Sequence, residues 1–149
     1  MVAGATVVSL AMVGAGTALG TPSSGTSSLV LASGIMKKNV RIHTEAVKVE
    51  TKGPTQVVTQ EITFQPGATS GWHSHPGLVL VTVKSGSQTV YNRHCKARTY
   101  TTGESFYESP KEAVVHNKGT PGAVSVATFL VPEGAPLRTD AENPCPGIP

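Results

Sequence analysis

Charged residues are scarce in this sequence, and they form no block of a single sign. They make up 14% of the 149 residues, with 12 Lys and Arg against 9 Asp and Glu, for a formal net charge of +3. Lys37 and Lys38 are the one adjacent basic pair. Proteins that track a phosphate backbone cluster their basic side chains on one face. The sequence therefore argues against nucleic acid as a partner.

Cysteine is also scarce, because only Cys95 and Cys145 occur. Two cysteines this far apart do not match the paired spacing of a structural zinc site. In an oxidising compartment, an even count favours a disulfide. That bond would tie the tail around Cys145 to the body of the protein, and two unpaired thiols are the alternative.

Helical periodicity is nearly absent after Gly20. Short runs of β-branched residues alternate instead with turns rich in Gly and Pro, which predicts one antiparallel all-β sandwich or barrel. The tail from Pro132 is rich in proline and is expected to run along the surface as an extended segment. The predicted strands cover Arg41–Glu50, Gln56–Phe64, Gly71–His75, Leu78–Lys84, Gln88–Tyr91, Arg98–Tyr100, Ser105–Tyr107, Ala113–Asn117 and Ala123–Val131.

The first twenty residues carry no charge and are mostly small or apolar. Residues 1–20 are typical of the apolar part of a secretory signal, which predicts a secreted or extracytoplasmic protein that leaves the membrane once the signal is removed. A single membrane anchor is the alternative, but four glycines weaken a spanning helix. We expect a polar spacer over 21–36 and one β-barrel domain over 37–149.

The stretch GWHSHPG holds two histidines, His73 and His75, one residue apart. On a strand, residues i and i+2 point to the same side, so both imidazoles can converge while Trp72 and Ser74 point away. Two imidazoles suit zinc, iron, nickel, copper or manganese better than calcium, and manganese is the less suitable where no carboxylate joins them. Two exposed surface histidines are the alternative for a pattern this short.

The longer stretch GATSGWHSHPGLVLVTVKSG, residues 67–86, resembles the first motif of the cupin superfamily, in which two glycines flank His-x-His. GESFYESPKEAVVHN, starting at Gly103, is similar to the second motif. The chain thus resembles small exported bacterial cupin-domain proteins. The resemblance implies a jelly-roll, or double-stranded β-helix, barrel. It further implies a divalent metal held by three histidines and one glutamate, and a homodimer formed through edge strands.

The chain departs from this family pattern at two places. The slot of the glutamate falls on Val79 or Leu80, neither of which binds metals. In the second motif, the slot of the histidine falls on Val114 or, counting back from Asn117, on Ala113. The nearest histidine is His116. Either a reshaped loop lets His116 act as the third ligand, or that ligand has been lost.

Two functions follow from these features, and the substrate is not identified by either. In the first, His73, His75 and His116 hold a divalent metal, and the barrel acts on a small molecule by oxygenase-like or isomerase-like chemistry. In the second, the barrel is a non-catalytic module that binds a small ligand beside a degenerate metal site. The second function is favoured by the missing glutamate and by the irregular second motif. Against the first, no obvious general acid or base lies within the two motifs.

Overall fold

The computed structural model describes residues 20–148, and all of its regular elements are β-strands. Except for Gly20, the signal-like segment 1–20 lies outside these residues. No helix in the described part is long and apolar enough to cross a membrane. The strands are β1 (Ser24–Met36), β2 (Arg41–His43), β3 (Lys48–Glu50), β4 (Thr55–Thr69), β5 (His73–Ser74), β6 (Leu78–Ser85), β7 (Ser87–Asn92), β8 (Ala97–Thr101), β9 (Ser105–Glu108), β10 (Ala113–His116), β11 (Ala123–Pro132) and β12 (Thr139–Asp140).

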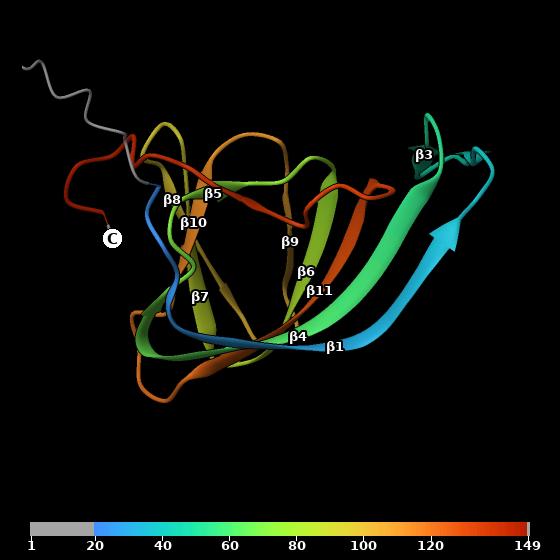
Figure 1. Ribbon diagram of the computed structural model, residues 1–149. Coiled ribbons are helices and arrows are strands. Elements are labelled where there is room, and N and C mark those ends of the chain that lie inside the picture. The colour runs from blue at the N-terminus through green and yellow to red at the C-terminus, as the bar shows by residue number, and fades with distance from the viewer. Residues whose placement is uncertain (1–19, 149) are drawn as a thin grey trace, which may run out of the picture.

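Ten of the strands form one antiparallel sheet that curls into a nearly closed barrel (Figure 1). Its main path runs β12-β5-β10-β4-β11-β6-β9. Strand β4 lies between β1 and β11, and β7 joins β10 to β8. The predicted all-β jelly-roll fold is confirmed.

The core fills the barrel because its strands alternate between apolar and polar residues. On β6, Val79, Val81 and Val83 are at most 4% exposed, whereas Leu78 and Leu80 on the other face are 42% and 50% exposed. The inner face of β6 packs against inward residues of β4, β9, β10 and β11. The tight alternation therefore fixes which side of each strand faces the barrel interior.

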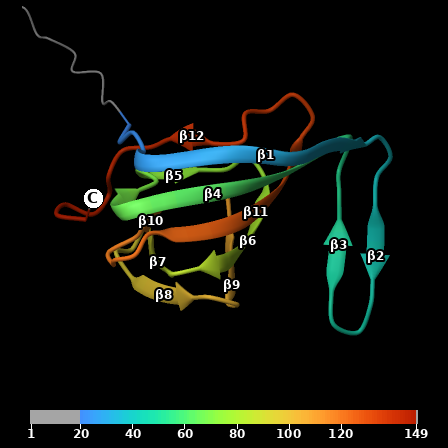
Figure 2. The same ribbon diagram turned by 90° about the horizontal axis from the view of Figure 1, so that it is seen from below.

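The polar spacer expected over 21–36 is instead mostly a strand, because β1 pairs with β4 from Ser24 to Met36. The sequence gives β1 no alternation, and nearly all of its residues are exposed on both faces. The segment predicted as one strand over Arg41–Glu50 is a hairpin, β2–β3, in which Ile42 pairs with Val49. This hairpin projects away from the barrel, beyond the ends of β1 and β4 (Figure 2).

A second apolar cluster lies on the other side of the sheet from the barrel core. It consists of Trp72, Tyr91, Val114 and Cys145, of which Trp72 and Val114 are fully buried. The expected disulfide between Cys95 and Cys145 is present, with Cα atoms 5.6 Å apart. It holds the tail that follows β11 against this cluster, and β12 within that tail pairs with β5.

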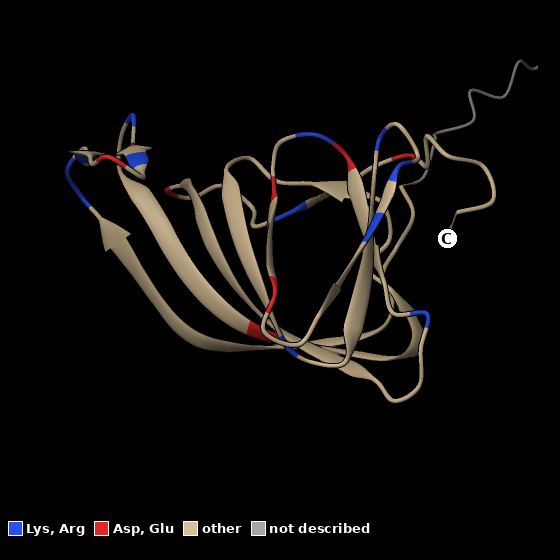
Figure 3. Ribbon diagram, turned by 180° about the vertical axis from the view of Figure 1, so that it is seen from behind, with Lys and Arg blue, Asp and Glu red and all other residues tan. Residues whose placement is uncertain are grey.

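Charged side chains are dispersed over the strands and loops without a continuous basic stripe (Figure 3). Several of the basic residues are paired, including Arg41 with Glu50 and Lys84 with Glu61. The surface of the described chain thus agrees with the scattered charge pattern of the sequence.

Candidate metal centre

Two glycines shape the short segment that carries the histidines. Gly71 has a positive φ of 66°, and a Cβ there would collide with the backbone oxygen of Thr21. A Cβ on Gly77 would collide with the backbone oxygen of Leu130. Only glycine combines this φ with so close a backbone approach. The two glycines therefore let the backbone on either side of His73 and His75 pass close to neighbouring segments.

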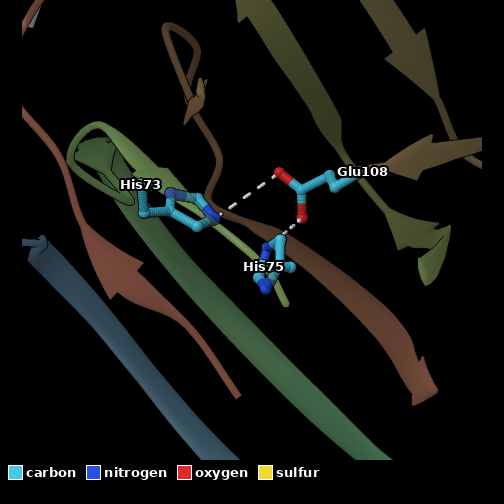
Figure 4. A group of neighbouring side chains, drawn as sticks. All are labelled: His73, His75 and Glu108. Atoms are coloured by element: carbon cyan, nitrogen blue, oxygen red, sulfur yellow. Dashed lines mark ion pairs between the residues drawn. The ribbon is translucent and has the colours of Figure 1, made fainter. Parts of the chain in front are cut away.

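His73 and His75 point to the same side, as predicted, and both are 4% exposed. Glu108, at the end of β9, faces them from across the barrel (Figure 4). His73 Nε2 lies 3.6 Å from Glu108 Oε1, and His75 Nε2 lies 3.3 Å from Oε2. All three ligand atoms lie within 4.8 Å of one another.

The other ring nitrogen of each histidine is held by a backbone carbonyl. His73 Nδ1 lies 2.9 Å from Gly71 O, and His75 Nδ1 lies 2.6 Å from Leu137 O. A carbonyl oxygen can only accept a hydrogen bond, so each Nδ1 carries the proton and donates it. Each Nε2 is then left with a lone pair directed at Glu108. Outer contacts of this kind set the tautomer and orientation of metal-binding histidines.

The side chains of His73, His75 and Glu108 bring hydrogen-bond acceptors together, with no hydrogen-bond donor between them. His75 Nε2 and Glu108 Oε1 are buried and have no hydrogen-bond partner. Buried polar atoms without partners are rare and destabilise the fold. A cation placed between the lone pairs, either a metal ion or a proton, would satisfy them. Ligand atoms that share one ion at about 2.1 Å lie about 3.0–3.5 Å apart, close to the two histidine–glutamate distances.

The pKa shifts of His73 and Glu108 favour the protonation states in which both side chains can bind a cation at neutral pH. Burial lowers the pKa of His73 below its usual 6.5, and the charge of Arg138 adds to this, against the opposing charge of Glu108. Burial alone would raise the pKa of Glu108, but the neighbouring imidazoles and the charge of Arg138 hold that pKa below 4.5. Neutral His73 and ionised Glu108 both offer free lone pairs.

The structure does not bring His116 to this group. His116 shares strand parity with Val114, as the sequence indicates, but Val114 packs in the Trp72 cluster on the outer side of the sheet. The inward residue of this part of β10 is Val115. Ala113 also faces inward and pairs directly with His73. The position that a third histidine would need is therefore held by alanine.

Sequence reasoning missed Glu108. The expected glutamate slot at Val79 is apolar, but Val79 pairs with Glu108 on the neighbouring strand β9. Residues directly opposite each other on paired strands share a face, so the carboxylate reaches the same interior from one strand away. A local signal existed, because Phe106 and Glu108 are two residues apart and Phe106 is a core residue.

The three residues lie in a barrel cavity of about 380 Å³. Apolar walls come from β4, β6, β9, β10 and β11, and polar residues come from β1 and β7. Leu137 and Arg138, in the tail before β12, close one side of it. The volume suits a small molecule.

Comparisons with known proteins agree with this architecture. Residues 60–132 match the family described as Cupin domain. A cupin domain from Bordetella pertussis is 20% identical, with 76% of this chain and 99% of that one covered and a TM-score of 0.50. A cupin superfamily protein from Desulfitobacterium hafniense is 13% identical, with 72% and 78% covered and a TM-score of 0.51.

A conserved protein of unknown function from Streptococcus pyogenes is 14% identical, with 73% of this chain and 76% of that one covered and a TM-score of 0.52. Among curated proteins, none matches this sequence. At such low sequence identities, the structural similarity shows a shared fold alone. The family match, the barrel topology and the inward His-x-His together show that the chain belongs to the cupin superfamily.

Proposed function

We propose that this cupin domain binds one divalent metal ion through His73, His75 and Glu108 and acts on a small molecule in the barrel cavity. The observation that carries the proposal is the convergence of three buried acceptor groups with no donor between them. Such an arrangement is costly in the absence of a cation. It replaces the expected ligand set of His73, His75 and His116 with one in which a carboxylate is the third member.

The donor set favours iron(II) or zinc among the four metals that the sequence left open. Two histidines and one carboxylate on one face of an ion are typical of non-haem iron(II) oxygenases, and two histidines with a glutamate also form catalytic zinc sites. When bound, such an ion would supply Lewis acidity or oxygen activation. The chain itself contributes a barrel cavity with partly apolar walls and two histidines fixed by backbone carbonyls.

A non-catalytic binding module is the second candidate. Glu108 is the one carboxylate among the residues that line the cavity, and it belongs to the metal set. No separate carboxylate in the described cavity lining is therefore free to act as a general base. A barrel that captures a ligand through a bound metal would need no such group.

Elemental analysis of purified protein tests the metal centre. We expect about one equivalent of iron or zinc in the parent after loading, and almost none in His73→Ala or Glu108→Ala. Glu104→Ala is a matched control, because that glutamate bonds to Thr101 at the exposed end of the neighbouring turn. Retention of one equivalent in Glu108→Ala, or no metal in the parent under any loading condition, would overturn the proposal.

Export and dimerisation remain proposals as well. The disulfide between Cys95 and Cys145 supports an oxidising, extracytoplasmic location. Three consecutive exposed apolar residues on β1, namely Leu29, Val30 and Leu31, support a homodimer formed through this strand. Sedimentation of the parent and of a Leu29→Ser variant would test the dimer, which we expect the substitution to weaken.

A further inference from the structure

We propose that the barrel cavity recognises a small carboxylate-bearing molecule with a hydrogen-bond donor at its opposite end. The carboxylate would bind at Arg138 beside the metal, and the donor would bind at Gln88. The inference rests on the proposed metal function and adds to it the chemical class of the ligand.

The charge of the cavity favours an anion. Glu108 and Arg138 are the two charged residues in its described lining. Once a divalent ion is bound, its two positive charges exceed the single negative charge of Glu108, while the charge of Arg138 is paired with Asp140 outside the lining. This excess of positive charge in the cavity favours an anionic ligand over a neutral one.

Arg138 is held in place for this role by the tail. Its Nη1 donates to Ser70 O at 2.8 Å, and its Nη2 donates to Asp140 Oδ1. Guanidinium carries five N–H donors, so these two bonds leave others for a ligand. Asp140 is exposed and lies outside the cavity lining, so it orients the arginine from behind. Planar guanidinium groups fixed in this way favour carboxylates over neutral ligands.

The far end of the cavity offers an acceptor. Gln88 is fully buried, and its Nε2 donates to Ser125 Oγ at 3.2 Å. Its Oε1 is buried and has no partner, although the residue lines the cavity. A buried amide oxygen without a donor destabilises the fold. A hydroxyl or amino group on the ligand would satisfy it.

The distance between the two ends sets the shape of the ligand. Ser125 and Phe129 lie on the same face of β11. Ser125 bonds to Gln88, and the ring of Phe129 lies 5.6 Å from that of His75, measured between centroids. Four residues along a strand span roughly 13 Å. Between them Ala127 belongs to the barrel core, and Phe106 and Val115 contribute apolar side chains to the cavity lining. The cavity therefore fits an elongated molecule with an apolar middle.

Matched ligand probes test this inference on the metal-loaded protein. We would measure binding of 3-(4-hydroxyphenyl)propanoate, its carboxamide, and 3-phenylpropanoate by calorimetry, together with hexanoate and benzoate and their carboxamides. We expect carboxylates to bind at least about tenfold more tightly than their carboxamides, because a charged hydrogen bond is lost in the amide. We expect the hydroxyl group to improve binding further.

Two arginine variants separate recognition from tail packing. Arg138→Met is expected to abolish the preference for carboxylate over carboxamide while the metal content stays near one equivalent. Arg41→Met is the matched control, because Arg41 also pairs with a carboxylate but lies on the projecting hairpin. If Arg138→Met does not fold, the probe comparison on the parent still decides the question.

Gln88→Met tests the other end, since it keeps the side-chain length and removes the acceptor. It should remove the advantage of the hydroxylated probe over 3-phenylpropanoate. Equal binding of carboxylates and carboxamides by a metal-loaded parent, or binding of neither, would overturn this inference alone. A parent that takes up no metal would overturn the proposed function, and the inference would fall with it.

Discussion

The two sides of the sheet around β5 differ sharply in what they hold. On the outer side, Trp72 packs with Val114 and the disulfide-bonded Cys145 and has its indole fully buried. On the inner side, one residue later, His73 meets His75 and Glu108 in a polar cluster with unsatisfied atoms. Consecutive residues thus belong to a packed apolar cluster on one face and to the candidate metal centre on the other. Strand alternation alone separates the two roles.

The largest effect on stability is expected on the outer side. Trp72→Ala should lower the free energy of unfolding by about 3–5 kcal/mol, because it leaves a large cavity in a fully packed cluster. Chemical denaturation measures the change. Tyr107→Ala is the control, since that aromatic residue is 70% exposed and its loss should matter little. Similar losses in both variants would contradict the contrast between the faces.

Removing the disulfide tests whether the outer cluster and the inner candidate metal centre depend on each other. Replacing Cys95 and Cys145 by serine is expected to reduce the free energy of unfolding by about 2–4 kcal/mol. Metal affinity should also fall, by roughly tenfold, because the tail supplies the carbonyl of Leu137 that orients His75. Denaturation and metal titration are measured on the same sample. Unchanged metal affinity in a destabilised variant would show that the faces are independent.

On the inner side, Glu108→Gln should matter only in the presence of metal. Without metal, the histidines can stay neutral, so no unpaired charge is left and the free energy of unfolding should change by less than about 1 kcal/mol. With metal at a hundredfold excess over its dissociation constant, the parent should gain about 2.7 kcal/mol, and the variant almost nothing. Thermal unfolding with and without metal measures both. A large loss without metal would make Glu108 a structural residue.

The metal-free protein should lose stability as the pH falls. The pKa of His73 is lowered by burial, so below about 6.5 the unfolded chain takes up a proton at this site that the folded chain resists. The pKa of Glu108 is also lowered in the folded chain, so below about pH 4.5 protonation of this carboxylate favours the unfolded chain as well. The stability contributed by both groups is therefore present at neutral pH and declines in acid. Comparing unfolding of the parent and His73→Gln from neutral to acidic pH measures the first part, and identical profiles would refute it.

The smallest effect is expected for His116→Ala. His116 lies outside the cluster of three ligands, on the face of β10 that it shares with Val114. Metal content should stay near one equivalent. Loss of the metal in this variant would restore His116 as a ligand and would require β10 to turn its other face inward.

Patterns within short stretches of sequence predicted much of the fold, but they did not predict which strands pair with each other. The convergence of His73 and His75 follows from the period of a strand, and so does the inward face of β6. Glu108 depends on the pairing of β9 with β6, which no short stretch encodes. The parity of His116 was also right, but which face of β10 is inward is set by its neighbours β5 and β7. Strand β1 was missed because it is exposed on both faces and lacks alternation.

The contact between Leu137 O and His75 Nδ1 links the C-terminal tail to the candidate metal centre. Every strand of the barrel from β1 to β11 precedes Leu137 in the chain, and so do the candidate ligands His73, His75 and Glu108. A chain truncated before Leu137 would keep these strands and all three candidate ligands but would lack the carbonyl that fixes the tautomer of His75. A tail that supplies no candidate ligand is therefore still part of the candidate metal centre.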